Sequence, residues 1–378
     1  MSGTMAFGRL AGVRIAIHWS WPIVFVLITW TLASGVFPSQ NPGLSHASYI
    51  VMAVAAALLF FGSLLLHELG HALQARREHV EIEGITLWLF GGVAKFTGDL
   101  PSAAAELRIA VAGPLVTLGL GLAFVVFAAL AALPDAVDGV AAWLGYVNLT
   151  LLVFNMLPAL PLDGGRVLRS LLWMRKHDLS EATVAAGAVA RVLAYLLIGG
   201  GVALFVFQGA FSGAWFAFIG WFLLQASEAE VRWVEAKHGL EGVRVRDLMT
   251  RAPVTVPEHL TLGQFVDDIV WRSRHTTYPV IEDGRPVGLL PFRSVAQVPR
   301  ERWNRQTVGE CMVPLELVPV LREEEPAVDA LLALRQGRGN RGLVVEGGSL
   351  VGILSVTDIA RALELRRLRG WARGAHSH

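Results

Sequence analysis

Long apolar runs separated by short polar segments dominate the chain up to about residue 233. Each run is close to the roughly 20 apolar residues that a helix needs to cross a membrane. The pattern predicts six membrane-spanning helices, at about residues 17–36, 49–74, 107–133, 185–207 and 211–233, with one more from residue 140 into a broken segment at 155–166. Trp19 and Trp21 stand at the start of the first run, as is typical of residues at a membrane interface.

After residue 235 the pattern becomes that of a soluble α/β domain, and it repeats. VRDLM at 245–249 opens one copy and VGECM at 308–312 opens the other, and each copy reads strand, helix, strand, tight turn, strand, helix. Asp283-Gly284 and Gly347-Gly348 are the predicted hairpin turns. We therefore expect a transmembrane domain over 1–235, a linker over 236–242, repeats over 243–305 and 306–365, and a basic tail over 366–378.

Lysine and arginine gather on one side of the predicted spans. The loops at about 37–48, 133–139 and 208–213 contain neither. Cytoplasmic loops are enriched in these residues, so the pattern predicts a multi-pass protein of the cell membrane with both termini in the cytoplasm. The basic residues on the predicted cytoplasmic side are Arg9, Arg14, Arg76, Arg77, Lys95, Arg108, Arg166, Arg169, Arg175, Lys176, Arg232 and Lys237.

The composition narrows the class of protein. Of 378 residues, 54% are hydrophobic and 17% charged, and the mean hydropathy is +0.52. These values exclude a disordered chain and are too apolar for an ordinary soluble protein. The net charge of +1 argues neither for a nucleic-acid partner nor for an acidic one, and we expect no nucleic-acid partner. The single cysteine, Cys311, permits no intrachain disulfide and fits a reducing compartment.

An ionisable cluster stands inside the second apolar run. In HELGH, His67 and His71 are four residues apart, so their imidazoles share one helix face and can reach one metal ion. Glu68 lies beside that face, where it can take a proton from a water at the metal. Because ionisable residues are costly inside a membrane, we interpret the cluster as a metal site and not as a chance match. Zinc suits two imidazoles, a third protein ligand and an open position for water.

The third ligand is expected where the fourth apolar run breaks. Two prolines and two glycines between residues 158 and 165 interrupt the helix, and a broken membrane helix commonly marks a site. Asp163 is the best candidate ligand, with capping of the following helix as the alternative. Asn155 can stabilise an oxyanion as a side-chain donor, or it is a helix-packing amide. The predicted topology brings this break and HELGH to the same, cytoplasmic end.

An apolar segment at residues 83–96 is too short to span as a helix. Gly91-Gly92 separates two β-prone runs, which predicts a hairpin that enters the protein at membrane depth; a surface loop with aromatic anchors is the alternative. A helical substrate must unwind before its peptide bonds can be attacked. We expect the edge formed by Gly91, Gly92 and Val93 to bind the unwound segment by strand addition.

Taken together, these motifs resemble the site-2 protease family of intramembrane zinc metalloproteases. HELGH matches the family's HExxH, the stretch from Asn155 to Asp163-Gly164-Gly165 matches its second motif, and Gly91-Gly92 resembles its membrane-dipping strand. The match covers about residues 8–225. The resemblance implies a transmembrane protein substrate in a lipid membrane. It also implies that His67, His71 and Asp163 are the zinc ligands. Glu68 would then be the general base, and Asn155 would contact the substrate or the oxyanion.

The polar repeats resemble a pair of cystathionine-β-synthase (CBS) domains. Such pairs often bind adenine nucleotides and regulate an attached enzyme. In that family a Ser or Thr three residues before an Asp contacts the ribose, and Ser355 and Asp358 match this pattern. The first copy has Pro291 and Ser294 at these places, so the resemblance implies at most one ribose site, for ATP, ADP or AMP. A structural role or homodimerisation through the CBS domains is the alternative.

The sequence therefore predicts a polytopic α-helical membrane protein with a short β segment, followed by a cytosolic α/β CBS pair. The predicted activity is that of a zinc metalloendopeptidase that cuts transmembrane segments in regulated intramembrane proteolysis, under nucleotide control by the CBS pair. A CBS-regulated transporter, or a non-catalytic protein that binds membrane partners, is the alternative. A transport path does not need a general base beside two ligands, so HELGH with Asp163 favours the protease.

Overall fold

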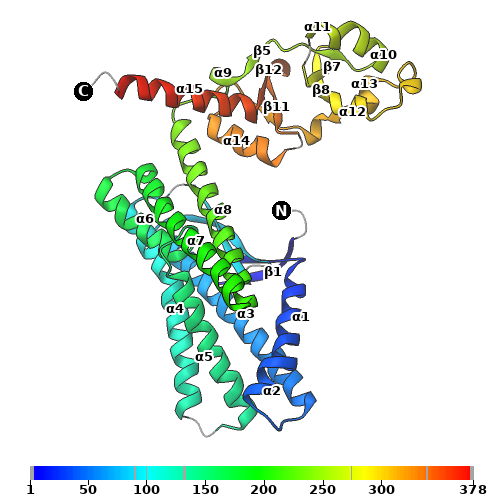
Figure 1. Cartoon of the computed structure of the whole chain (residues 1–378). Coiled ribbons are helices and arrows are strands. Elements are labelled where there is room, and N and C mark those ends of the chain that lie inside the picture. Colours follow the sequence, from blue (N-terminus) through cyan, green and yellow to red (C-terminus); the bar gives the residue numbers. More distant parts are fainter. Residues whose placement is uncertain are drawn as a thin grey trace. The chain divides into compact units, whose positions relative to one another are not determined.

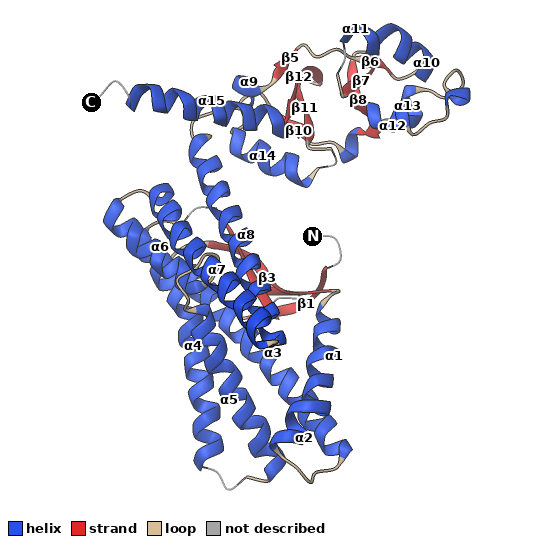
Figure 2. Cartoon of the chain, viewed as in Figure 1, coloured by secondary structure: helices blue, strands red, loops and turns tan. Residues whose placement is uncertain are grey.

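The chain folds into two units, Met1–Val234 and Glu235–His378 (Figure 1). The computed structural model describes residues 4–88, 91–98, 100–130, 133–273, 275–337 and 339–374. The first unit is mainly helical and contains one small sheet, whereas the second combines helices with two sheets (Figure 2).

The helices of the first unit follow the apolar runs. They are α1 (Trp21–Thr31), the π-helical turn η1 (Leu32–Val36), α2 (Phe37–Gln40), α3 (His46–Arg77), α4 (Ala103–Leu130), α5 (Asp135–Asn155), α6 (Asp163–Lys176), α7 (Leu179–Gln208) and α8 (Phe211–Gly239). Five stretches of the described chain are long and apolar enough to cross a membrane: Trp21–Gln40, α3, α4, α5 and α7. The sixth expected span lies in α8, which is not among the five.

The structure differs from the expected pattern in two places. The first helix begins at Trp21 and not near residue 17, because Val13–His18 forms a strand. The stretch after the break contains four basic residues and suggests only a connection between spans, but in the structure it is helix α6, which is capped by His177 in the left-handed conformation. Its apolar and basic residues recur with helical spacing, and Arg175 and Lys176 lie in the last turn, where positive charge is favourable.

The first unit also contains a four-stranded sheet. Its strands lie in the order β1 (Thr4–Leu10), β2 (Val13–His18), β3 (Glu81–Trp88) and β4 (Gly91–Thr97). Ala11 and Gly12 join β1 to β2 with φ of 49° and 81°, as a type I′ hairpin turn requires. The hairpin expected at 83–96 is present as the antiparallel pair β3 and β4, although Leu89 and Phe90 lie outside the described residues. β4 is an edge strand of this sheet.

Helix α3 is the long element on which the site is built. Ser45 caps its start by accepting a hydrogen bond from the Ser48 amide, and Arg76 and Arg77 close its last turn. Gly70 lets α4 approach α3 closely, because a Cβ at this position would lie only 3.0 Å from the carbonyl oxygen of Ala112.

The second unit contains the predicted repeats. The first repeat comprises α9 (Val245–Leu248), β5 (Thr250–Arg251), β6 (Val256–Pro257), α10 (Leu262–Gln264), η2 (Phe265–Val270), α11 (Trp271–Ser273), β7 (Thr277–Glu282), β8 (Arg285–Pro291), α12 (Phe292–Ala296) and η3 (Arg300–Arg302). The second comprises α13 (Val308–Cys311), β9 (Val313–Pro314), η4 (Leu315–Leu317), β10 (Val320–Leu321), α14 (Ala327–Gln336), β11 (Arg341–Glu346), β12 (Ser349–Ser355) and α15 (Val356–Gly374).

The two repeats exchange short strands. The sheets have the orders β6-β7-β8-β9 and β10-β11-β12-β5, so the first strand of each repeat pairs with the other repeat. The predicted turns at Asp283-Gly284 and Gly347-Gly348 are confirmed, with all four residues at positive φ. Helix α15 continues to Gly374 through most of the expected tail, and residues 375–378 lie outside the described chain.

Candidate metal centre

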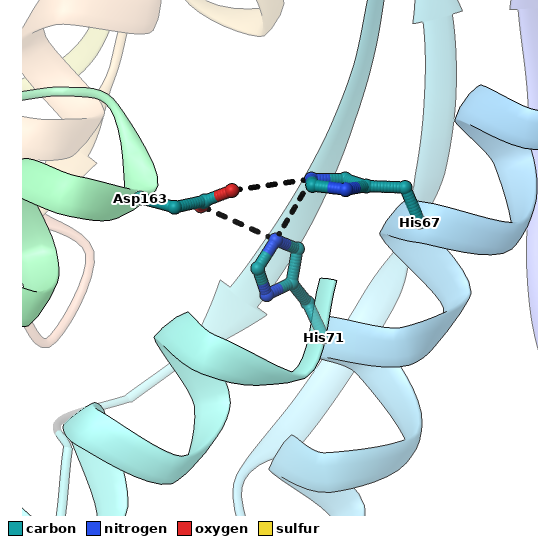
Figure 3. A group of neighbouring side chains, drawn as sticks. All are labelled: His67, His71 and Asp163. Carbon is teal, nitrogen blue, oxygen red and sulfur yellow. Dashed lines mark hydrogen bonds and ion pairs between the residues drawn. The ribbon is translucent and has the colours of Figure 1, made fainter. Parts of the chain in front are cut away.

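The two histidines of HELGH lie on one face of α3 and point toward a carboxylate from α6 (Figure 3). His67 Nε2 lies 3.2 Å from Asp163 Oδ2, and His71 Nε2 lies 3.2 Å from Asp163 Oδ1. The two Nε2 atoms are 3.1 Å apart. Both histidines are buried, with exposed fractions of 4% and 5%. Two imidazole nitrogens and a carboxylate therefore converge on one point, as the ligands of a metal ion do.

Helix α4 holds the far side of each imidazole. The Nδ1 atom of His71 lies 2.7 Å from the carbonyl oxygen of Ile109, and that of His67 lies 2.8 Å from Thr117 Oγ1. A carbonyl oxygen only accepts hydrogen bonds, so His71 carries its proton on Nδ1 and its Nε2 lone pair remains available to a metal. Such outer contacts orient metal-binding histidines in proteins.

Gly113 gives α4 its close approach to the histidines. A Cβ at this position would lie 2.3 Å from His71 Nε2 and 2.8 Å from His67 Cε1, which no real side chain could occupy. Ile109, Gly113 and Thr117 follow one another at intervals of four residues and so share one face of α4. Ile109 and Thr117 were missed from the sequence, and this spacing is the signal that points to them.

The break after α5 delivers Asp163 as the first residue of α6. The cap of this helix is Leu162, without a side-chain hydrogen bond, so Asp163 does not cap it and instead directs both oxygens at the histidines. Gly164 and Gly165 pack directly on the broken segment: a Cβ would lie 2.3 Å from the Met156 carbonyl oxygen and 2.3 Å from the Leu160 amide nitrogen, respectively. These glycines explain why α6 can start so close to the break.

Glu68 lies against the backbone of strand β4. A Cβ on Gly92 would fall 2.4 Å from Glu68 Cγ, so the strand and the glutamate are in direct contact at this position. Gly91 and Val93 flank Gly92 in β4; the Val93 side chain lies outside what the structure describes. Asn155 is the half-buried last residue of α5, eight residues before Asp163.

The residues singled out in the second unit form a local capping motif. Ser355 donates from both its amide and its hydroxyl to Asp358 Oδ2, at 3.0 and 2.6 Å. Both residues line a cavity of about 170 Å³, together with His275, Thr276 and Arg341. A larger hollow of about 640 Å³ shares Thr276 and Arg341 with it. Ligand sites commonly have volumes of roughly 300–1,000 Å³, so the larger hollow has room for a small molecule.

The chain is similar to known families and proteins along most of its length. The model of Peptidase family M50 matches residues 55–138 and 131–199, and that of the CBS domain matches residues 245–301 and 308–365. The protein named "Putative zinc metalloprotease Rip3" of Mycobacterium tuberculosis is 39% identical over 97% of this chain and 95% of its own length. "Zinc metalloprotease MJ0392" of Methanocaldococcus jannaschii is 29% identical over 98% of both chains.

A solved structure is similar to part of the chain. "Site-2 Protease from Methanocaldococcus jannaschii" is 28% identical, covers 60% of this chain and 95% of its own, and has a TM-score of 0.41. The sequence similarities to the two curated relatives extend over both units.

Proposed function

The chain belongs to Peptidase family M50, the site-2 protease family of zinc metalloproteases, and from this membership we propose what its metal centre does. It is an intramembrane protease that hydrolyses peptide bonds within or near transmembrane segments of other membrane proteins. We propose His67, His71 and Asp163 as the ligands of one zinc ion. The observation that carries this assignment is the convergence of their three ligand atoms in a buried position.

The donor set fits zinc. Two imidazoles and one carboxylate are a common catalytic zinc set, because a fourth position remains for water. The Ile109 carbonyl and Thr117 face the Nδ1 atoms, which leaves both Nε2 atoms directed at the centre. A bound zinc ion would lower the pKa of a coordinated water to about 7 and polarise the scissile carbonyl.

Glu68 is the proposed general base. It follows His67 on α3 and so lies beside the ligand face. Glu68 takes the proton as the oxygen of water attacks the carbonyl carbon of the peptide bond. It then gives the proton to the amide nitrogen as the carbon–nitrogen bond breaks. Asn155 is proposed to donate a hydrogen bond to the substrate or to the developing oxyanion.

The edge strand β4 is the proposed holder of the substrate. A transmembrane helix keeps its peptide groups in its own hydrogen bonds, so a cleavable segment must be extended. Gly91, Gly92 and Val93 lie on an edge strand whose backbone contacts Glu68 at Gly92. A segment added to this edge would lie next to the general base, and main-chain hydrogen bonds would bind it without demanding a particular sequence.

We propose six spans, with α8 added to the five apolar stretches, and both termini in the cytoplasm. The support is the absence of Lys and Arg from the loops at about 37–48, 133–139 and 208–213 of the sequence. On this topology the protein is a multi-pass protein of the cell membrane, with its metal centre toward the cytoplasmic face and its CBS pair in the cytosol.

The CBS pair is proposed to bind an adenine nucleotide and to regulate the protease. Support comes from the match to the CBS family and from the cavity lined by Ser355 and Asp358. Calorimetry with ATP and with AMP on the full chain tests this proposal. Asp358→Ala should abolish binding, whereas Ser294→Ala, at the corresponding position of the first repeat, should not. Unchanged binding in Asp358→Ala would exclude this site. Homodimerisation through the pair is also proposed, and light scattering of the full chain measures it.

The protease proposal is tested in cells that express either the wild-type chain or Glu68→Gln. Mass spectrometry should find membrane-protein fragments that arise only with the wild type, since loss of a general base typically costs 10²–10⁴-fold in rate. Glu81→Gln, an exposed glutamate on β3, is the matched control and should cleave normally. The purified wild type and Glu68→Gln should each hold one zinc per chain. Equal cleavage by Glu68→Gln would refute the proposed role of this residue.

A further inference from the structure

A buried ion-pair junction lies on α6, away from the three proposed ligands. Arg169 donates from Nε and Nη2 to Oε1 of Glu106 on α4, at 2.8 and 2.5 Å. Its Nη1 donates to Oε1 of Glu230 on α8, at 2.8 Å. One guanidinium therefore joins α4, α6 and α8, which are distant in the sequence.

Burial makes this junction rigid. Arg169 is 6% exposed and Glu106 is 2% exposed. Separating a buried pair leaves uncompensated charges and is strongly unfavourable. The second oxygen of Glu106 has no hydrogen-bond partner among the described residues, so the pair depends on the one oxygen that Arg169 contacts. The planar guanidinium also fixes the direction of its contacts, so the pair fixes how α6 is placed against α4.

The junction shares its helices with the proposed zinc ligands. Asp163 precedes Arg169 by six residues on α6, about 9 Å at the helical rise of 1.5 Å per residue. Glu106 precedes Ile109 by three residues on α4, and Ile109 and Thr117 contact the two ligand histidines. Helix α4 thus contacts the histidines through one set of residues and the Asp163 helix through another.

Glu230 adds α8 to the junction. Arg169 and Glu106 already balance each other's charge, so a second carboxylate is not needed for neutrality. The Glu230 side chain is 30% exposed, which makes it the most accessible of the three. Helix α8 extends to Gly239, beyond Val234, where the first unit ends. Any shift of α8 along its axis would act on Arg169 through this contact.

We propose that Arg169 is a positioning residue for the zinc site. Its ion pair with Glu106 fixes α6 against α4 and so holds Asp163 in place, and its contact with Glu230 lets a movement of α8 change the position of α6. The proposal rests on the proposed zinc site. It assigns the ion pair a role in metal retention that differs from a general contribution to folding, since the pair acts on one ligand and not on the two histidines.

The rate of zinc loss from the purified full-length protein to a chromogenic chelator tests this role. Arg169→Lys keeps the charge but loses the forked contact, and zinc should leave about 10-fold faster, as for other outer-shell changes. Glu230→Gln should change the rate in the same direction by less. Arg232→Gln, which removes an exposed pair with Glu228 on the same helix, is the matched control and should leave the rate unchanged.

A second comparison separates positioning from general stability. In a chain that carries Asp163→Asn, adding Arg169→Lys should not speed zinc loss further, because the ligand that Arg169 positions is already absent. An equal acceleration in both backgrounds, or a folded Arg169→Lys that loses zinc at the wild-type rate, would overturn the proposal. If Arg169→Lys does not fold, a wild-type rate in Glu230→Gln overturns it. A wild-type chain without one zinc would instead refute the proposed function itself.

Discussion

Thr117→Val is the sharpest test of how the metal centre is held. The hydroxyl of Thr117 lies 2.8 Å from His67 Nδ1, and the residue is 1% exposed. Valine has nearly the same shape but replaces the hydroxyl with a methyl group. When Nε2 of His67 binds the metal, its ring proton is on Nδ1, and this N–H loses its acceptor in the variant without a change in packing volume. No water replaces the lost partner easily at so buried a position.

The expected magnitude follows from this loss. A buried donor without a partner costs about 1–3 kcal/mol, and loss of an outer-shell contact typically weakens metal binding by roughly 10–100-fold. The two ranges agree, because each tenfold change in the dissociation constant corresponds to about 1.4 kcal/mol of binding free energy. We therefore expect zinc affinity to fall by about 10–100-fold in Thr117→Val, measured by competition with a chelator of known affinity.

Two further variants separate the hydrogen bond from packing. Thr183 on α7 is 0% exposed, and its hydroxyl donates to the Leu179 carbonyl oxygen of its own helix at 2.7 Å. Thr183→Val makes the same chemical change away from the site and should leave zinc affinity unchanged. Thr117→Ser keeps the hydroxyl and should stay close to the wild type. Zinc affinity of Thr117→Val within twofold of Thr183→Val would refute the reasoning.

Three further predictions concern close contacts and the lone cysteine. Gly113→Ala should abolish stoichiometric zinc binding, because its Cβ would overlap the ligand imidazoles. Gly119→Ala on the same helix, whose Cβ would have no atom within 4 Å, should bind zinc normally, and elemental analysis measures the zinc content of both. Gly92→Ala should lose cleavage yet keep its zinc, since its Cβ would displace Glu68 and not a ligand; a variant that loses zinc would contradict this. Burial raises the pKa of the Cys311 thiol, and the charge of Glu310 raises it further. The alkylation of Cys311, followed by mass spectrometry, should therefore reach its half-maximal rate at a pH above the ordinary thiol pKa of about 8.5.

The sequence predicted well what depends on local spacing. HELGH lies on a helix because four-residue spacing and an apolar run both require one, and the hairpin turns of the second unit follow from Asp-Gly and Gly-Gly. The break between α5 and α6 was recognised from its prolines and glycines, and the structure brings Asp163 from this break to both histidines.

What the sequence did not predict depends on packing between distant segments. The extent of helix α6 was not predicted because its basic residues indicated only a connection, and its buried positions are Gly164, Gly165, Arg169 and Ser170 and not its large apolar residues. The sequence suggests one short surface strand over about residues 8–15, where the structure has the two strands β1 and β2. All residues of β1 are exposed, so no alternation of buried and exposed positions marks its start at Thr4. The sequence predicts six spans, and the sixth, α8, is not among the five stretches of the described chain that are long and apolar enough to cross a membrane. Its aromatic residues are combined with Gln225, Glu228 and Glu230.

The arrangement of α4 explains why three ligands from separate elements meet with defined geometry. Four positions of this helix, each three or four residues from the next, contact the ligand-bearing helices: Glu106, Ile109, Gly113 and Thr117. One face of α4 therefore does three things. Gly113, which has no side chain, sets the distance to α3, and the oxygens of Ile109 and Thr117 orient the two imidazole rings. Glu106 places α6 through its ion pair with Arg169. The segment before α6 has only short-range backbone hydrogen bonds, such as those from the Ala159 amide to the Leu157 carbonyl oxygen and from the Leu162 amide to the Ala159 carbonyl oxygen. The contacts from α4 therefore add to the placement of Asp163, and substitutions on this face of α4 should change zinc retention even though none of its residues belongs to the proposed ligand set.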